Sequence, residues 1–196
     1  RFLSPKEMEV ILSPVEVQQH LARLRTLTDR ALKTLVQEVE PARLYDPVRF
    51  VLDGGGKRLR PQLVFLSAAV YGKTSVAVLP AALAVEVFHN FTLLHDDIMD
   101  DSPIRRGQPT VHEKWDVNTG ILSGDLMLIQ AYQHLCEVPN KAALPALLCT
   151  FNRVATGVCE GQQYDVDFEV RNTVTIEECL KMIELRTAVL LGGSLE

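Results

Sequence analysis

The segment Ala81–Asp101, AALAVEVFHNFTLLHDDIMDD, joins a long apolar run directly to four aspartates within six residues. The apolar residues have helical spacing, which predicts a helix that carries the acidic cluster at its end. Asp96 and Asp100 are four residues apart, so their side chains would point the same way. Like charges held together repel, and a divalent cation between them relieves the repulsion. Ligands that are all oxygen favour Mg2+ or Ca2+ over zinc.

Two basic clusters favour a ligand over the alternative, a solvated acidic helix end. Arg105-Arg106-Gly107 follows the aspartates, and arginine binds phosphate oxygens in a bidentate manner. Gly54-Gly55-Gly56-Lys57-Arg58-Leu59-Arg60-Pro61 places three cations after three glycines, and glycine lets the backbone approach a ligand closely. Mg2+ commonly bridges carboxylates to substrate phosphates. The combined pattern therefore predicts a Mg2+–diphosphate site.

Other polyanion sites fit the glycine-rich segment less well. It is not a nucleotide-binding P-loop, because Arg58 follows the lysine where Ser or Thr is required. Leu59 stands where the third glycine of a dinucleotide fingerprint would be. A nucleic acid is not expected as a partner, because the net charge of the chain is −5 rather than basic.

Taken together, these motifs resemble the trans-isoprenyl diphosphate synthases of the polyprenyl synthetase family, of the short-chain farnesyl or geranylgeranyl type. The resemblance covers roughly Asp46 to the end of the chain. Its elements occur in the family's order: Gly55–Pro61, Asp96–Asp100, Arg105–Gly107, Leu122–Asp125, Gly161-Gln162 and Arg186-Thr187. Each motif alone is weak, whereas the ordered set is specific.

The resemblance implies a Mg2+-dependent prenyltransferase that condenses isopentenyl diphosphate with an allylic diphosphate into a short-chain (C15–C20) trans-prenyl diphosphate. In such enzymes the allylic diphosphate ionises, and the carbocation alkylates the double bond of isopentenyl diphosphate. Asp96, Asp97 and Asp100 would hold Mg2+, and Asp96, Asp100 and Arg105 would be catalytic. Mg2+ and Arg105 would stabilise the departing diphosphate as Lewis acid and hydrogen-bond donor.

By the same resemblance, two groups of side chains would bind the two diphosphates. The homoallylic diphosphate would be held by Lys57, Arg60, His89, Arg106. The allylic diphosphate would be held by Arg105, Gln162, Arg186, Thr187. His89 lies seven residues before Asp96, so the two share one helical face. Taken alone, Gln162 and Arg186 would be expected at solvent-facing helix positions. Asp165 and Asp167 follow in an acidic stretch that could equally face solvent. The family usually has lysine where Arg186 stands, and Arg58 is expected to be structural or at the surface.

Phe88 and Phe91 are the expected determinants of product length. Phe91 lies five residues before Asp96, and Phe88 is three residues earlier on the same side as Phe91. Helical spacing puts Phe91 off the face of Asp96, so its role as a floor under the growing tail rests on the resemblance. The alternative is that both rings only pack in the core.

Two other functions remain as alternatives. A class I terpene cyclase would share the aspartate motif, but it binds one diphosphate and has no use for the cations of Lys57–Arg60. A non-catalytic subunit of a heteromeric synthase would pair with an active partner. Such subunits often lose aspartates, whereas Asp96, Asp97 and Asp100 are all present here.

Composition and periodicity predict an all-α, single-domain chain over residues 1–196, which the resemblance makes an isoprenoid synthase-type helical bundle. The content is 47% hydrophobic and 6% aromatic. Pro41–Asp46 and Pro103–His112 are expected loops, and Thr175–Glu178 resembles a capping box. The expected helices are one beginning at Pro14 with the stripe Leu21, Leu24, Leu27, Ala31 and Leu35, then about Asp46–Leu52, Pro61–Tyr71, Pro80–Met99, Val117–Cys136, Lys141–Asp167 and Thr175–Leu195.

A second aspartate-rich motif, which the family carries farther along, is not present in this sequence. The chain stops at Glu196, before the second aspartate-rich motif of the family, so we expect the bundle to be incomplete and this chain alone to be inactive. The family forms homodimers.

No apolar stretch of eighteen residues escapes charge, and the start Arg1–Glu7 is charged, so neither a transmembrane helix nor a signal peptide is expected. The four cysteines lack paired spacing and are expected to be reduced core residues of a cytoplasmic protein.

Overall fold

The computed structural model describes residues 13–35 and 39–196, and the chain start Arg1–Glu7 lies outside the described residues. The regular secondary structure of the described part is helical apart from one pair of two-residue strands, which confirms the all-α prediction. The elements are α1 (Pro14–Leu35), α2 (Ala42–Asp53), α3 (Leu59–Val70), α4 (Ser75–Met99), β1 (Ile104–Arg105), β2 (Gln108–Pro109), α5 (Val111–Lys114), α6 (Val117–Glu137), η1 (Lys141–Ala143), α7 (Leu144–Glu169), α8 (Ile176–Ile183), η2 (Glu184–Ala188) and α9 (Val189–Gly193).

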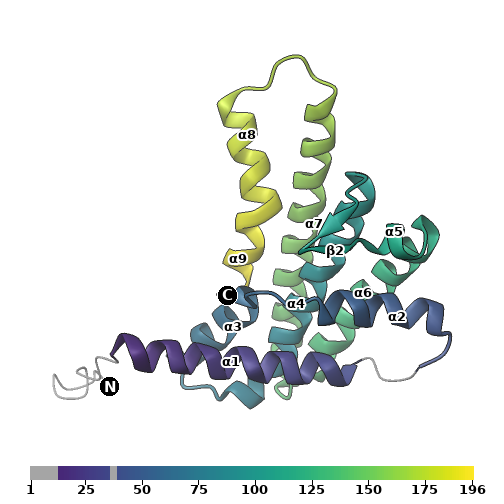
Figure 1. Cartoon of the computed structure of the whole chain (residues 1–196). Coiled ribbons are helices and arrows are strands. Elements are labelled where there is room, and N and C mark those ends of the chain that lie inside the picture. Colours follow the sequence, from purple (N-terminus) through teal and green to yellow (C-terminus); the bar gives the residue numbers. More distant parts are fainter. Residues whose placement is uncertain (1–12, 36–38) are drawn as a thin grey trace.

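Helix α4 lies at the centre of the structure. It packs against α6 on one side and α3 on the other, while α1 crosses the base and α7 and α8 rise side by side (Figure 1). Its Val87 and Phe88 are fully buried with Met127 of α6. Burial of such side chains stabilises the fold by roughly 1.5–3 kcal/mol each. The helix that ends in the aspartates is therefore also the core of the bundle.

Several expected boundaries are wrong. Helix α4 begins at Ser75 and not at Pro80, because the Thr74 hydroxyl accepts from the Ala77 amide and caps the helix there. The expected loop Pro103–His112 contains the hairpin β1–β2 and the start of α5.

Pro41–Asp46 is not a loop, because α2 already begins at Ala42 and Pro41 is the residue before its first turn. The expected helix Thr175–Leu195 is interrupted by the π-helical turn η2, which separates α8 from α9. Its start was predicted correctly: the Thr175 hydroxyl accepts from the Glu178 amide, and the Glu178 carboxylate accepts from the Thr175 amide.

Two helices of the described part have the length and hydropathy of membrane-spanning segments. Helix α4 and the segment Lys141–Glu169 are long and apolar enough to cross a membrane, with mean hydropathy of 1.6 and 1.3, so the sequence-based exclusion of such helices is not confirmed. Core helices of soluble proteins meet the same criterion.

The cysteines are free but are not core residues, because three of them lie on exposed helix faces and Cys179 is half-buried.

Candidate active site

Asp96 and Asp100 face the same point at the end of α4. The helix ends at Met99, and Asp100 is the residue that follows it. Nη2 of Arg186 lies 2.5 Å from Oδ1 of Asp96 and 3.7 Å from Oδ2 of Asp100. Burial, and next the charge of Asp96, raises the pKa of Asp100. The two carboxylates therefore converge on one cationic group, as the four-residue spacing predicts.

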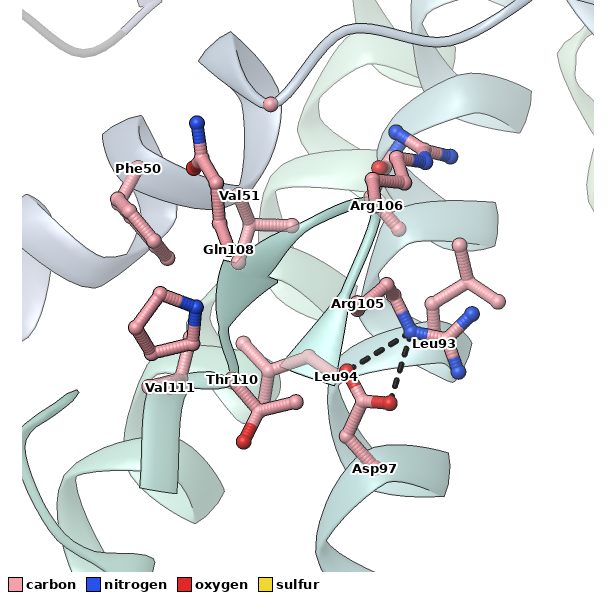
Figure 2. Close-up of a pocket in the computed structure, with 13 residues that line it drawn as sticks. Phe50, Val51, Leu93, Leu94, Asp97, Arg105, Arg106, Gln108, Thr110 and Val111 are labelled. Carbon is pink, nitrogen blue, oxygen red and sulfur yellow. Dashed lines mark hydrogen bonds and ion pairs between the residues drawn. The ribbon is translucent and has the colours of Figure 1, made fainter. Parts of the chain in front are cut away.

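Asp97 points away from this pair and is held by Arg105. Both of its carboxylate oxygens accept from Nε of Arg105, at 2.7 and 2.9 Å, as Figure 2 shows. Arg105 belongs to the short hairpin β1–β2, and its Nη2 also lies 3.8 Å from Asp96. Burial raises the pKa of Asp97, against the opposing effect of Arg105. The structure thus connects Asp97 to the cluster through Arg105 and does not bring it into the Asp96–Asp100 pair.

A cavity of about 330 Å³ lies beside Asp96, between α4, α7 and η2. Segments far apart in the sequence meet there: the basic segment, the apolar helix, Gly161-Gln162 and Arg186-Thr187. The predicted site residues that line it are Arg60, His89, Phe91, Asp96, Gln162, Arg186 and Thr187. Much of the remaining wall is apolar, from side chains such as Leu93, Val158 and Leu190. The lining therefore combines charged side chains with a largely apolar wall.

The π-helical turn η2 brings Arg186 to the cavity. A Cβ atom added to Gly161 of α7 would lie 2.5 Å from the backbone nitrogen of Arg186, so only glycine permits this approach of the two helices. Asp165, one turn further along α7, forms an ion pair with Arg186. Single π-turns inside helices frequently occur at functional sites. Sequence periodicity predicted neither the turn nor the role of Asp165.

Gln162 contributes a polar group to the cavity. Its Nε2 is buried and, among the described residues, has no hydrogen-bond partner. A buried donor without a partner costs free energy, so a ligand or water that accepts from it would be favoured.

A second cavity, of about 550 Å³, is basic. Its lining residues are Arg25, Gly56, Lys57, Arg58, Leu59, Arg60, Glu86, His89 and Arg106. All four side chains that the sequence assigned to the homoallylic diphosphate thus meet in one place. Arg60 and His89 line both cavities, so the two cavities adjoin.

Close packing of backbone and cations shapes the basic cavity. Arg106 donates to the carbonyl oxygen of Gly55, and a Cβ atom on Gly56 would lie 3.2 Å from Nη1 of Arg106. Gly56 also has a φ angle of 146°, which side chains rarely allow. The glycine run therefore lets Arg106 lie directly against the backbone.

His89 is neutral in this setting. Burial, and next the charge of Arg60, lowers the pKa of His89 to about 3. Its Nε2 lies 3.1 Å from Nη1 of Arg60, and a neutral ring accepts this hydrogen bond. His89 consequently orients Arg60 without adding a charge of its own.

Arg58 is structural rather than at the surface, since its side chain is only 2% exposed and pairs with Glu86 and Asp29. Sequence reasoning missed the partner role of Glu86, whose one signal is its place as a charged residue inside an apolar helix.

The two phenylalanines occupy different depths. Phe91 lines the 330 Å³ cavity, and its ring centroid lies 4.8 Å from that of His95. Phe88 is fully buried behind it, 5.6 Å from Phe91 and 5.1 Å from Phe151 between ring centroids. Phe91 is therefore placed to touch a molecule in the cavity, whereas Phe88 supports it.

One further group of potential ligands lies next to the aspartate motif. Single ligand atoms of Asp101, His112 and Glu113 lie within 4.8 Å of one another. Both carboxylates are exposed, Asp101 almost completely.

The sequence model of the polyprenyl synthetase family matches residues 41–196. The chain therefore belongs to the polyprenyl synthetase family, as the ordered motifs indicate. It is 46% identical over 168 residues to a geranylgeranyl diphosphate synthase of Methanosarcina mazei, covering 85% of this chain and 52% of the relative. It is 40% identical over 198 residues to a geranylfarnesyl diphosphate synthase of Natronomonas pharaonis, covering 91% of this chain and 57% of the relative.

Solved structures agree with this assignment. A crystal structure of a geranylgeranyl pyrophosphate synthase has a TM-score of 0.85 at 57% identity, over 89% of this chain and 53% of that one. A crystal structure of a geranylgeranyl pyrophosphate synthetase from Pyrococcus horikoshii has a TM-score of 0.87 at 36% identity. The match covers 92% of this chain and 56% of that one. The fold is thus that of the isoprenoid synthase helical bundle. The chain spans about half the length of the curated relatives it matches.

Proposed function

We propose that the full-length protein is a Mg2+-dependent trans-prenyltransferase that joins isopentenyl diphosphate to an allylic diphosphate. The observation that carries the proposal is the pair of adjoining cavities that share Arg60 and His89. One is lined by Asp96, Arg186 and a largely apolar wall, and the other is basic. Such a pair suits a substrate that must ionise beside a second diphosphate. The names of the relatives, which are synthases of geranylgeranyl and geranylfarnesyl diphosphate, support the same reaction class.

The aspartates at the end of α4 suit Mg2+. Asp96 and Asp100 offer only oxygen atoms and already converge on a cation, the guanidinium of Arg186. Asp97 is the third proposed ligand, although Arg105 now takes both of its oxygens. Bound Mg2+ would supply a Lewis acid for the departing diphosphate.

The cations have separate proposed tasks. Arg105 and Arg186 would neutralise the departing allylic diphosphate, with Gln162 and Thr187 as hydrogen-bonding partners. Lys57, Arg60 and Arg106 would hold the homoallylic diphosphate, with His89 keeping Arg60 in place. The apolar wall would keep water from the carbocation. Two diphosphates together carry roughly five or six negative charges, which accounts for this many cations.

Product length is the finer part of the proposal. We infer a C15–C20 product, with Phe91 as the floor of the cavity and Phe88 behind it. By resemblance to the family, we also infer that the protein acts as a homodimer in the cytoplasm. Light scattering of the purified protein and cell fractionation test these two inferences.

The reaction is tested by incubating the full-length protein with dimethylallyl diphosphate and labelled isopentenyl diphosphate, with and without Mg2+. A longer labelled prenyl diphosphate that forms only with Mg2+ supports the proposal. A cyclic hydrocarbon made from the allylic substrate alone would indicate a terpene cyclase. Activity that requires an added second synthase subunit would indicate a non-catalytic partner.

A further inference from the structure

Arg58 has an unusual backbone for an arginine. Its φ angle is 50° and its ψ angle 38°, in the left-handed region that residues with a Cβ atom rarely adopt. It is the residue directly before α3, and it separates Lys57 from Arg60, both of which line the basic cavity. The chain direction between these two cations therefore depends on how Arg58 is held.

The side chain of Arg58 is fixed by three hydrogen bonds from three different nitrogens. Nε donates to Oδ1 of Asp29 at 2.8 Å, and Nη1 donates to Oε1 of Glu86 at 2.7 Å. Nη2 donates to the carbonyl oxygen of Leu52 at 2.7 Å. These partners belong to α1, α4 and α2, so one side chain ties the basic segment to three helices. Two carboxylates also balance its charge.

Glu86, a partner of Arg58, is itself anchored on α4 next to the residue that holds Arg60. Glu86 is only 3% exposed, and its Oε1 also accepts from Nδ2 of Asn90 at 3.2 Å. His89, on the same turn of α4, pairs with Arg60. On the other side, Nε2 of Gln62 donates to the carbonyl oxygen of Lys57 at 2.7 Å. One turn of α4 thus holds Arg58 through Glu86 and Arg60 through His89.

We propose that Arg58 is a positioning residue for the homoallylic diphosphate: the Arg58–Glu86–Asp29 network holds the left-handed turn that directs Lys57 and Arg60 into the basic cavity. The inference rests on the proposed function. Each guanidinium nitrogen of Arg58 already donates to a protein oxygen, so its effect on the substrate comes through the backbone and not through its own charge. Gln162, Arg186 and Thr187, which α7 and η2 carry on the allylic side, have no hydrogen bond to this network within the described part of the chain. The two cavities share only Arg60 and His89.

The test compares Arg58→Gln and Glu86→Gln in the full-length protein. Both are expected to raise KM for isopentenyl diphosphate by about ten- to a hundredfold, because small misplacements of binding groups have effects of that size. KM for the allylic substrate should change by less than about threefold, a difference below 1 kcal/mol. Glu86→Gln is the sharper variant. It removes a negative charge from a cavity that binds an anion, so a purely electrostatic effect would lower KM, whereas lost positioning raises it.

Two controls separate positioning from loss of stability. Ser123→Ala removes another side-chain hydrogen bond, from the buried Ser123 hydroxyl to the carbonyl oxygen of Leu44, and Ser123 lines neither cavity. It should lower Tm without changing either KM. Arg58→Lys keeps the charge but cannot make three bonds, so it should resemble Arg58→Gln and serves if that variant fails to fold. Unchanged KM for isopentenyl diphosphate in the Arg58 and Glu86 variants, or a lower value in Glu86→Gln, would overturn the inference.

Binding of inorganic diphosphate, measured by calorimetry, distinguishes this inference from the proposed function. If the wild type binds diphosphate, the two Gln variants bind it more weakly and no condensation occurs, the positioning role stands and the proposed reaction fails. If the wild type neither condenses substrates nor binds diphosphate, both are overturned.

Discussion

Arg186 forms an ion pair with Asp96 across ninety residues of sequence, with its Nη2 2.5 Å from Oδ1 of the aspartate. The same nitrogen lies 3.7 Å from Asp100. A guanidinium therefore lies between the two carboxylates that the proposed metal would use. Arg186 and Mg2+ would compete for the same oxygens until a diphosphate arrives to accept the arginine.

Arg186→Gln should therefore bind Mg2+ more tightly in the absence of substrate. We expect a gain of about tenfold or more, because unit charges about 4 Å apart near a protein surface repel by roughly 4 kcal/mol. Turnover should fall in the same variant, since the allylic diphosphate loses a cation. Calorimetric titration with Mg2+ and steady-state kinetics measure the two effects.

Arg171→Gln is the matched control for this prediction. It also removes an arginine from the α7–α8 region, but its partner is Glu178 and not an aspartate of the site. It should leave both Mg2+ affinity and turnover unchanged. Equal Mg2+ affinity in wild type and Arg186→Gln would mean that the arginine does not compete with the metal.

His89 should remain neutral far below the usual range for histidine. Its pKa is about 3 in the folded protein and about 6.5 when unfolded, so the unfolded state binds more protons between these values. The stability linked to His89 is thus fully present above pH 6.5 and is lost as pH falls toward 3. NMR of the imidazole ring should show no protonation at pH 5, and added diphosphate should raise the pKa.

The matched variant for this experiment is His89→Gln. Because it removes the titrating ring, its free energy of unfolding should depend less on pH between 3 and 6.5 than that of the wild type. A His89 ring that protonates near pH 6 in the folded protein would contradict the burial seen here.

Phe91→Ala should lengthen the product by at least one isoprene unit with little loss of rate. Its ring lines the cavity beside Asp96, so removing it deepens the space available to the growing tail. Phe88→Ala should have a smaller effect, because Phe88 lies behind Phe91 and is packed against Phe151. Chromatography of the hydrolysed products measures chain length.

Phe65→Ala controls for general loss of core packing. Phe65 is buried in a separate cluster with Leu24 and Ala82. This variant should be less stable by about 3–5 kcal/mol yet make products of unchanged length. If the double variant Phe88→Ala/Phe91→Ala also makes products of wild-type length, the floor lies elsewhere.

The sequence predicted features that depend on local spacing. Apolar periodicity located α4, and the four-residue interval placed Asp96 and Asp100 toward one point. The capping residues at Thr175 identified the start of α8. These signals are short-range, so they can be read from neighbouring residues alone.

Features that depend on tertiary packing were missed. The π-turn at Arg186 follows from the close approach of Gly161, which no helical periodicity reveals. Asp97 shares the helix of Asp96 but is turned toward Arg105 by a hairpin that lies later in the chain. The start of α2 could not be predicted from Pro41 alone, because proline is common both in loops and just before the first helical turn, where it stands here.

The proposed Mg2+ site is tested by comparing Asp96→Asn, Asp100→Asn and Asp101→Asn in the Mg2+-dependent condensation of labelled isopentenyl diphosphate. Asp101 belongs to the same acidic run, but its side chain is 98% exposed, so it reports the effect of lost charge alone. We predict that the first two variants lose turnover by about a hundredfold or more, with unchanged helical content, and that Asp101→Asn retains it. Turnover near the wild-type value in Asp96→Asn or Asp100→Asn, or an equal loss in all three variants, would contradict the account.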